Sequence, residues 1–211
     1  ANYDPALNFY NYAPQTNYNY CNEGIALAGY IVEVLTGTPF NIYCNQNIFE
    51  PLCMDNTGWF LSEIDTNLVA HPYIYSGGEF IDAGLYGYPD YPDGQLRTTA
   101  LSLSKFMYMH MQYGNFNGVQ ILDSATVAYM HSDILSEVVT EQGVVFYSYN
   151  EDDGIWWGHS GGDSGVSTDM FFNHTTNTGL IILTNGEANH DNIWYEILEA
   201  MDTLTNLSAP V

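Results

Sequence analysis

The sequence predicts an α+β fold in which helices flank an antiparallel sheet. Helical apolar spacing and loop-forming residues dominate residues 1–143, whereas residues 144–211 contain four short strand-like segments and a final amphipathic segment. Strands joined by short polar turns form an antiparallel meander, on which helices of the same chain pack. With 211 residues, of which 46% are hydrophobic, the chain is long and apolar enough for one packed domain. We therefore expect a single domain over residues 1–211.

The first half of the chain is expected to contain two helices and a long irregular region. Residues 1–19 show no periodicity and predict a loop or an extended segment. Apolar residues then recur at helical spacing over residues 22–35, with Asn22 as the predicted N-cap. A second short helix is expected over residues 39–49, and the Gly-, Pro- and Tyr-rich stretch 57–97 predicts long loops.

The second half begins with helices and ends with the sheet. Helical spacing predicts helices over residues 100–113 and 124–131, separated by a turn at residues 115–118. A closing amphipathic helix is expected over residues 192–204. The four predicted strands cover residues 144–149, 155–158, 166–172 and 179–184.

The charge balance excludes several classes of partner. The chain has only two basic residues, Arg97 and Lys105, against 25 acidic ones, for a net charge of −23. Phosphate groups are bound mainly by Lys and Arg, so we expect no nucleic-acid partner and no anionic membrane surface. No apolar run reaches the roughly 18 residues of a membrane span, so no integral membrane segment is expected. The scarcity of bases predicts a cold- or salt-adapted protein.

The three cysteines predict no metal site. Cys21, Cys44 and Cys53 lack zinc-ligand spacing, and we expect neither a metal nor a cofactor. Cys44 and Cys53 could form one disulfide, or all three could be buried apolar thiols. No Lys or Arg lies near Cys21 in the sequence to lower its pKa, so we do not expect Cys21 to be a nucleophile. Solvated loop carboxylates that match no calcium-binding loop are expected at residues 90–93, 152–153 and 163.

Four short motifs follow one another along almost the whole chain. They are Tyr20-Cys21-Asn22 with its following helix, Ile48 to Thr57, Gly94 to Ala100, and Gly158 to Ser167. Each is weak alone, but together and in this order they resemble the serine β-lactamase and penicillin-binding protein superfamily. The nearest resemblance is to its class C branch, which includes D,D-peptidases, D-aminopeptidases and esterases. One position departs from the family pattern, since Cys53 stands where the second motif has Gly.

The nucleophile of this family is missing from the chain. The family carries it in a Ser-x-x-Lys motif N-terminal to Tyr-x-Asn, but residues 1–19 contain neither serine nor lysine. A literal match, Ser102-Leu103-Ser104-Lys105, lies after Tyr20. We interpret Ser102 as structural and Lys105 as an exposed helix residue. The chain thus resembles a C-terminal portion of the family domain, incomplete at its N-terminus and without the N-terminal strands and the helix bearing Ser-x-x-Lys.

The resemblance implies roles for five residues. Tyr20 would transfer the proton of the nucleophile, Asn22 would donate to the substrate's amide carbonyl, and His159 would orient the substrate carboxylate or the developing charge. Gly161 and Gly162 would let the strand backbone approach the substrate, and the Gly162 N–H would form one arm of an oxyanion hole. Each residue also has a structural interpretation. Tyr20 would be a packing residue, Asn22 a helix cap and His159 a hydrogen-bonded structural histidine. Gly161 and Gly162 would form a turn or a bulge.

The tyrosines between residues 73 and 91 are interpreted as a self-packed loop, although the resemblance would place them beside the active-site cleft.

Two functions remain open. The first is a serine hydrolase that cleaves D-peptides, β-lactams or esters through an acyl-enzyme, with its Ser-x-x-Lys supplied by a longer precursor or a separate chain. The second is an inactive domain with a structural, assembly or ligand-binding role. The missing strands would leave a sheet edge and an apolar face exposed, so a partner chain or self-association is expected to cover them. The resemblance further implies a secreted or periplasmic location.

Overall fold

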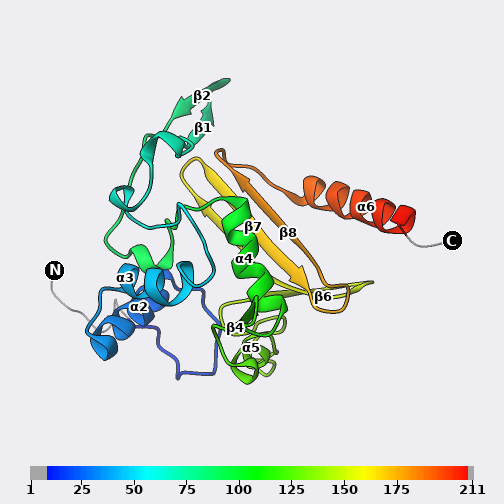
Figure 1. The fold of residues 1–211 in the computed structure, drawn as a ribbon. Helices are drawn as coiled ribbons and strands as arrows, with labels where there is room; N and C mark the ends of the chain where they lie inside the picture. The colour runs from blue at the N-terminus through cyan, green and yellow to red at the C-terminus, as the bar shows by residue number, and fades with distance from the viewer. Residues whose placement is uncertain (1–8, 209–211) are drawn as a thin grey trace.

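The α+β class is confirmed by a computed structural model, which describes residues 9–208. The main sheet is fully antiparallel, and its strands lie in the order β5-β6-β7-β8 (Figure 1). All four predicted strands are present, as β5 (Tyr147–Glu151), β6 (Gly154–Asp163), β7 (Val166–Asn173) and β8 (Thr178–Thr184). Two strands differ from the prediction at their ends. Strand β5 begins at Tyr147 and not at residue 144, and the strand predicted to end at residue 158 continues as β6 through Gly161 and Gly162, which pair with β7.

The N-terminal helices follow the prediction except at their ends. Helix α2 (Asn22–Thr36) leads to α3 (Phe40–Cys44), which continues as a π-helix (Asn45–Phe49). Asn22 is the first helical residue and not the cap. Cys21 holds the N-cap position in an extended conformation and makes no side-chain capping bond. Asn22 is thereby left available for another role.

The region predicted as irregular contains a hairpin. Strands β1 (Tyr73–Ser76) and β2 (Glu79–Asp82) pair through a turn at Gly77 and Gly78, and they project from the rest of the fold (Figure 1). Both glycines have positive φ, of 62° and 91°, which glycine adopts without strain. Three 3₁₀ turns complete this region, namely Leu61–Glu63, Thr66–Leu68 and Tyr91–Asp93.

Three further helices match their predicted positions. Helices α4 (Ala100–Met111) and α5 (Ser124–Met130) are both capped, by the side chains of Thr99 and Asp123. A small hairpin, β3 (Asn115–Phe116) and β4 (Val119–Gln120), separates them where a turn was predicted. Helix α6 (Asp191–Ser208) is longer than expected.

Helix α4 joins two hydrophobic cores. Met109 packs into a cluster with Leu52 and Trp59 in the helical part, whereas Met107 and Met111 pack against β6 and β7. Residues four apart share one face of a helix, and the residue midway between them points to the opposite side. The helix therefore lies between the helical part and one face of the sheet, as Figure 1 shows.

Neither expectation for the cysteines holds. All three are free thiols, so the Cys44–Cys53 disulfide is not formed. Only Cys44 is buried, and burial raises its pKa to about 12, while Cys21 and Cys53 are exposed. Cys53 also has a φ of 54°, in the left-handed region that favours glycine, the residue that the family motif carries at this position.

No single helix within residues 9–208 is long and apolar enough to cross a membrane; α2 and the α3–π-helix segment pass that test only as a pair, and they are bent by 80°.

Candidate active site

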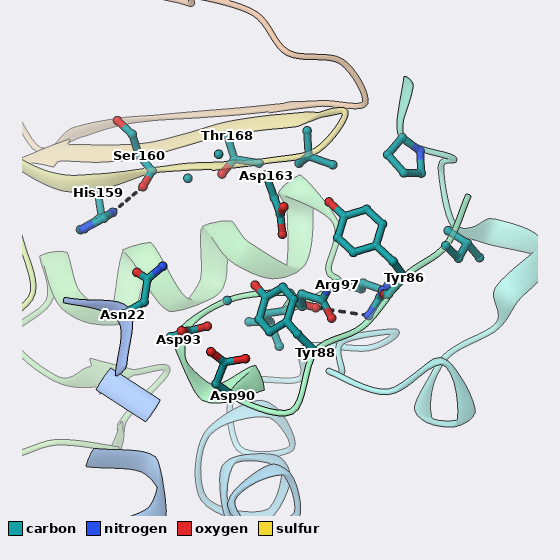
Figure 2. Close-up of a pocket in the computed structure, with 18 of the residues that line it drawn as sticks. Asn22, Tyr86, Tyr88, Asp90, Asp93, Arg97, His159, Ser160, Asp163 and Thr168 are labelled. Atoms are coloured by element: carbon teal, nitrogen blue, oxygen red, sulfur yellow. Dashed lines mark hydrogen bonds between the residues drawn. The ribbon is translucent and has the colours of Figure 1, made fainter. Parts of the chain in front are cut away.

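A cavity of about 1030 Å³ lies between the sheet, the start of α2 and the loop at residues 85–97 (Figure 2). It is called the cleft below. All five residues that the sequence singled out line it, namely Tyr20, Asn22, His159, Gly161 and Gly162. The fold therefore brings the first and the last motif together at one place.

The start of α2 positions two of these residues. Cys21 is extended, with φ of −148° and ψ of 106°. Side chains alternate along an extended backbone, so Tyr20 and Asn22 reach the cleft while the thiol of Cys21 is directed to Glu23. Tyr20 is 57% exposed, which leaves its phenol accessible. The spacing of Tyr-x-Asn thus follows from a single extended residue before a helix.

His159 sits between two tyrosines. Its ring stacks on Tyr147, with centroids 4.6 Å apart and planes at 27°, and the ring of Tyr20 lies 6.1 Å away on centroids. Its Nδ1 contacts the carbonyl of Ser160. Tyr147 comes from β5, directly opposite Gly158, and its hydroxyl lies 3.4 Å from that of Tyr18. Burial, followed by Tyr18, raises the pKa of Tyr147, so its phenol stays protonated.

The sequence did not identify Tyr147, since its contact with His159 depends on the register between two strands. Thr168, which also lines the cleft, was missed for the same reason.

The two glycines of β6 differ in what they require. A Cβ at Gly161 would lie 2.6 Å from Oγ1 of Thr168 across the strand pair, so a side chain there would force Thr168 to move. A Cβ at Gly162 would meet nothing within 4 Å. Both belong to a regular ladder with β7, so the alternative of a turn or bulge is wrong. Packing explains the glycine at 161 but not the one at 162.

The loop wall of the cleft is held by Arg97. Its guanidinium donates to the carbonyls of Trp59 at 2.7 Å, Tyr86 at 2.6 Å and Gln95 at 3.4 Å. Because all three acceptors are main-chain oxygens, the arginine fixes the course of the loop. Each of the two interpretations of the tyrosines in this region, a self-packed loop and a border of the cleft, holds for some of them. Tyr86 and Tyr88 line the cleft, whereas Tyr91 packs against Trp59 in the core.

Carboxylates dominate the electrostatics of the cleft. Asp163 at the end of β6 points toward the wall that carries Tyr88, Asp90 and Asp93 (Figure 2). Burial, with the charges of Asp163 and Asp93, raises the pKa of Tyr88 to about 12. The pKa of Asp93 is likewise raised by burial and then by Asp90. In residues 9–208, no group of three or more His, Cys, Asp or Glu side chains is placed to hold a metal ion.

The literal Ser-x-x-Lys match lies outside the cleft. Ser102 is buried in α4 and donates from Oγ to the carbonyl of Asp55 at 2.9 Å, which confirms its structural interpretation. Lys105 contacts the carbonyl of Cys53 and is half-buried, so the expectation of an exposed residue is wrong. Together they attach α4 to the segment around residues 53–55.

Sequence comparison identifies a relative that is longer than this chain. Penicillin-binding protein 4 of Amycolatopsis lactamdurans is 26% identical over 186 residues, which are 82% of this chain and 48% of that protein. The chain thus spans about half the length of the curated relative it matches.

Structural comparison shows the same fold at low identity. A penicillin-binding protein homologue from Pyrococcus abyssi, described as octameric, matches with a TM-score of 0.72 and 24% identity, over 82% of this chain and 40% of that one. A D-amino acid amidase from Ochrobactrum anthropi matches with a TM-score of 0.75 and 18% identity, over 92% and 60% of the two chains.

The family itself is shown by a direct match. The Beta-lactamase family model aligns with residues 9–201, a range that contains every motif described above. The order of the motifs, the fold and the convergence of Tyr20, Asn22 and His159 agree with that match. The chain belongs to the β-lactamase family, within the superfamily that includes the penicillin-binding proteins.

Proposed function

We propose that this chain carries the substrate-binding part of a serine acyl hydrolase, which cleaves D-peptide, β-lactam or ester bonds through an acyl-enzyme. The observation that carries the proposal is the meeting of Tyr20, Asn22 and His159 on one cleft from segments far apart in the sequence. The start of α2 supplies Tyr20 and Asn22, and β6 supplies His159 to the same space.

In the proposed reaction, the chain's residues handle protons and orientation. A serine hydroxyl loses its proton as it attacks the substrate carbonyl, and the leaving group gains one. Tyr20 is exposed to the cleft and, with the lysine of the Ser-x-x-Lys segment as its proton partner, passes the proton from the serine to the leaving group. The Asn22 amide donates to the substrate's amide carbonyl, and His159, held by Tyr147, stabilises the developing charge. The Gly162 N–H serves as one arm of the oxyanion hole.

The proposed nucleophile belongs to a Ser-x-x-Lys segment outside these 211 residues, on a longer chain or on a partner. Two surfaces support such an addition. Among the described strands, β8 pairs only with β7, which leaves its other edge open. Helix α2 exposes a series of large apolar side chains, namely Leu27, Tyr30, Ile31, Val34 and Leu35. An added segment or a second copy of the chain would cover both surfaces.

The test is the intact mass of the native material before and after a fluorophosphonate probe. We expect a protein heavier than 23.6 kDa, or a two-chain complex, that gains one probe mass on a Ser-x-x-Lys peptide. In that native protein, Tyr20→Phe should slow labelling by about 10²–10⁴-fold, as loss of a general base does. Tyr129→Phe is the matched control, since Tyr129 is equally exposed on α5. A complete native protein that gains no adduct contradicts the proposal.

A second candidate is an inactive ligand-binding or assembly domain. It is favoured by the placement of the literal Ser-x-x-Lys match, whose Ser102 and Lys105 contact main-chain carbonyls away from the cleft. A native mass near 23.6 kDa with no adduct but with retained ligand binding would support this function instead.

A further inference from the structure

The hydroxyl of Thr168 lies in the cleft without a protein partner. Thr168 is on β7 directly opposite Gly161, and residues that pair across two strands share one face of the sheet. It is half-buried and lines the cleft. Within residues 9–208 its oxygen takes part in no hydrogen bond. The adjacent Ser167 hydroxyl, on the other face of β7, is paired with the side chains of Thr184 and His190.

A second unpaired hydroxyl belongs to Tyr88 on the loop wall. Tyr88 is also half-buried, and its phenol oxygen has no hydrogen-bond partner in the described part of the chain. Burial, with the charges of Asp163 and Asp93, raises its pKa to about 12, so the phenol keeps its proton and can donate. Figure 2 shows Tyr88 on the loop side and Thr168 on the sheet side of the same space. Hydroxyls left half-buried without a protein partner are satisfied by water or by a ligand.

Each of these hydroxyls occupies space that a glycine leaves free. A Cβ at Gly161 would lie 2.6 Å from Oγ1 of Thr168, and a Cβ at Gly94 would lie 2.2 Å from the hydroxyl oxygen of Tyr88. Any other residue at either position would therefore displace the hydroxyl. Both glycines belong to the sequence motifs, whereas Tyr88 and Thr168 belong to none. The two motif glycines thus make room for two polar atoms on opposite walls of the cleft.

The proposed reaction sets the direction of the substrate. Tyr20 passes the proton to the leaving group, so the leaving group lies at the end of the cleft where Tyr20 and His159 meet. The acyl part of the substrate then extends the other way, along β6 toward Asp163. This path runs between Thr168 and Tyr88 (Figure 2).

We propose that Thr168 and Tyr88 determine the acyl specificity of the cleft, because their free hydroxyls hydrogen-bond to amide groups in the acyl part of the substrate. This inference rests on the proposed function, since it assigns the substrate class of the same site. An amide carbonyl accepts two hydrogen bonds and an amide N–H donates one. The bond from Asn22 therefore leaves capacity for the Tyr88 phenol to donate and for the Thr168 hydroxyl to accept. A hydrocarbon acyl chain would displace water from both hydroxyls and give them no partner in return.

Two p-nitrophenyl esters with acyl chains of equal length test the inference on the complete native protein. The N-acetylglycinate carries an amide in its acyl chain, and the pentanoate carries only hydrocarbon. Thr168→Val and Tyr88→Phe each remove one hydroxyl and keep the shape of the side chain. We expect each variant to lower kcat/KM for the N-acetylglycinate about two- to tenfold, the effect of one lost hydrogen bond, and to leave the pentanoate unchanged.

Further variants separate specificity from damage to the site. Thr168→Ser restores the hydroxyl and should recover the preference for the N-acetylglycinate. Tyr129→Phe, on α5 outside the cleft, should change the rate with neither ester. Fluorophosphonate has no acyl amide, so Thr168→Val and Tyr88→Phe should react with it at the parent's rate.

Three results would overturn the inference. They are an equal loss with the two esters, no loss with either, and a native protein that takes the fluorophosphonate adduct but does not cleave the N-acetylglycinate. The proposed function fails separately, through the absence of a fluorophosphonate adduct on the native protein.

Discussion

The two faces of the sheet each carry a histidine beside a potential proton acceptor, yet they are organised in opposite ways. On the cleft face, His159 stacks on Tyr147 and no carboxylate hydrogen-bonds to it in the described part of the chain. On the other face, His190 contacts Asp169 at 2.6 Å through Nδ1 and Ser167 Oγ at 3.1 Å through Nε2. The second arrangement has the distances of a Ser-His-Asp triad.

Triad distances alone do not make a nucleophile. The Ser167 hydroxyl lies 2.9 Å from the carbonyl of Gly186 and accepts from the N–H of Ala188 at 3.0 Å, so the β8–α6 connection surrounds it. His190 itself is buried. The hydroxyl is thus already engaged by the ring of His190 and by main-chain groups of the connection. The cleft face shows the reverse, with side chains that are accessible and held by stacking. We therefore interpret the Ser167 group as a structural attachment of the connection to α6.

The largest expected effect comes from breaking this attachment. Asp169→Ala leaves Nδ1 of the buried His190 ring without its carboxylate partner, and a buried polar group that loses a bond to a charged group costs about 3 kcal/mol of unfolding free energy. Urea unfolding followed by fluorescence measures it. Asp163→Asn in the cleft should change stability by less than about 0.5 kcal/mol. Equal losses of unfolding free energy in the two variants would contradict the structural role of the Ser167 group.

A second expected effect concerns the part of the cleft-side face covered by α4. Burial lowers the pKa of His110 to about 4 and that of His131 to about 3. Both lie below the unfolded value of about 6.5, so the unfolded state binds more protons. The contribution of these two neutral histidines to the unfolding free energy is therefore fully present above about pH 6.5 and is lost as the pH falls toward 4. For His110 the loss is about 3 kcal/mol.

Unfolding free energies at pH 7, 6, 5 and 4 check this acid sensitivity. His110→Leu should flatten the curve, because it removes the buried titratable group and its unpartnered Nδ1. Thr168→Val, in the cleft, serves as the comparison and should retain the slope of the parent protein, because it removes no group that titrates between pH 4 and 7. An unchanged slope in His110→Leu would contradict the assignment.

A smaller effect is expected at Ser167. Ser167→Ala removes a hydroxyl that contacts Thr184, Gly186 and Ala188, and one such hydrogen-bonding group contributes about 1 kcal/mol. The urea midpoint measures the change. In the unsubstituted protein, fluorophosphonate should leave Ser167 unmodified, and an adduct mapped to that residue would show that this part-buried hydroxyl is reactive.

The smallest effect is expected at Tyr147. Tyr147→Leu removes the stacked ring and should shift the imidazole resonances of His159, with a stability loss of about 0.5–1.5 kcal/mol. Tyr147→Phe keeps the ring and should leave those resonances in place. If both variants shift them equally, the hydroxyl contact to Tyr18 positions His159, and stacking does not.

The sequence predicted elements whose local signals were long and consistent. Helices α2 and α4 have apolar spacing over several turns, and both were placed within a few residues. The β1–β2 hairpin was missed because its strands have four residues each within a Gly- and Tyr-rich stretch. The extension of β6 through Gly161 and Gly162 was missed because glycines suggest a turn locally, whereas the register with β7 is a tertiary property.

The residues of the candidate site also separate into those with a local sequence signal and those placed by tertiary structure. Tyr20, Asn22 and His159 were found because short motifs carry them. Tyr147 and Thr168 belong to no motif, and they reach the cleft only through strand pairing. In the attachment formed by Ser167, Asp169 and His190, only Ser167 belongs to a motif. The sequence did not connect the three, since residues 167 and 169 share a face of β7 while residue 190 returns from beyond β8.

The position of α4 between two cores has a consequence for how the molecule folds. Because Met109 belongs to the helical cluster and Met107 and Met111 to the sheet cluster, neither cluster can lose the helix without opening the other. Subglobal opening in proteins follows such shared elements, and slowly exchanging amides mark them. The backbone amides of α4 should therefore exchange with solvent at the rate of global unfolding, in step with β7. The two parts of the chain then behave as one cooperative unit, joined by a helix of three turns.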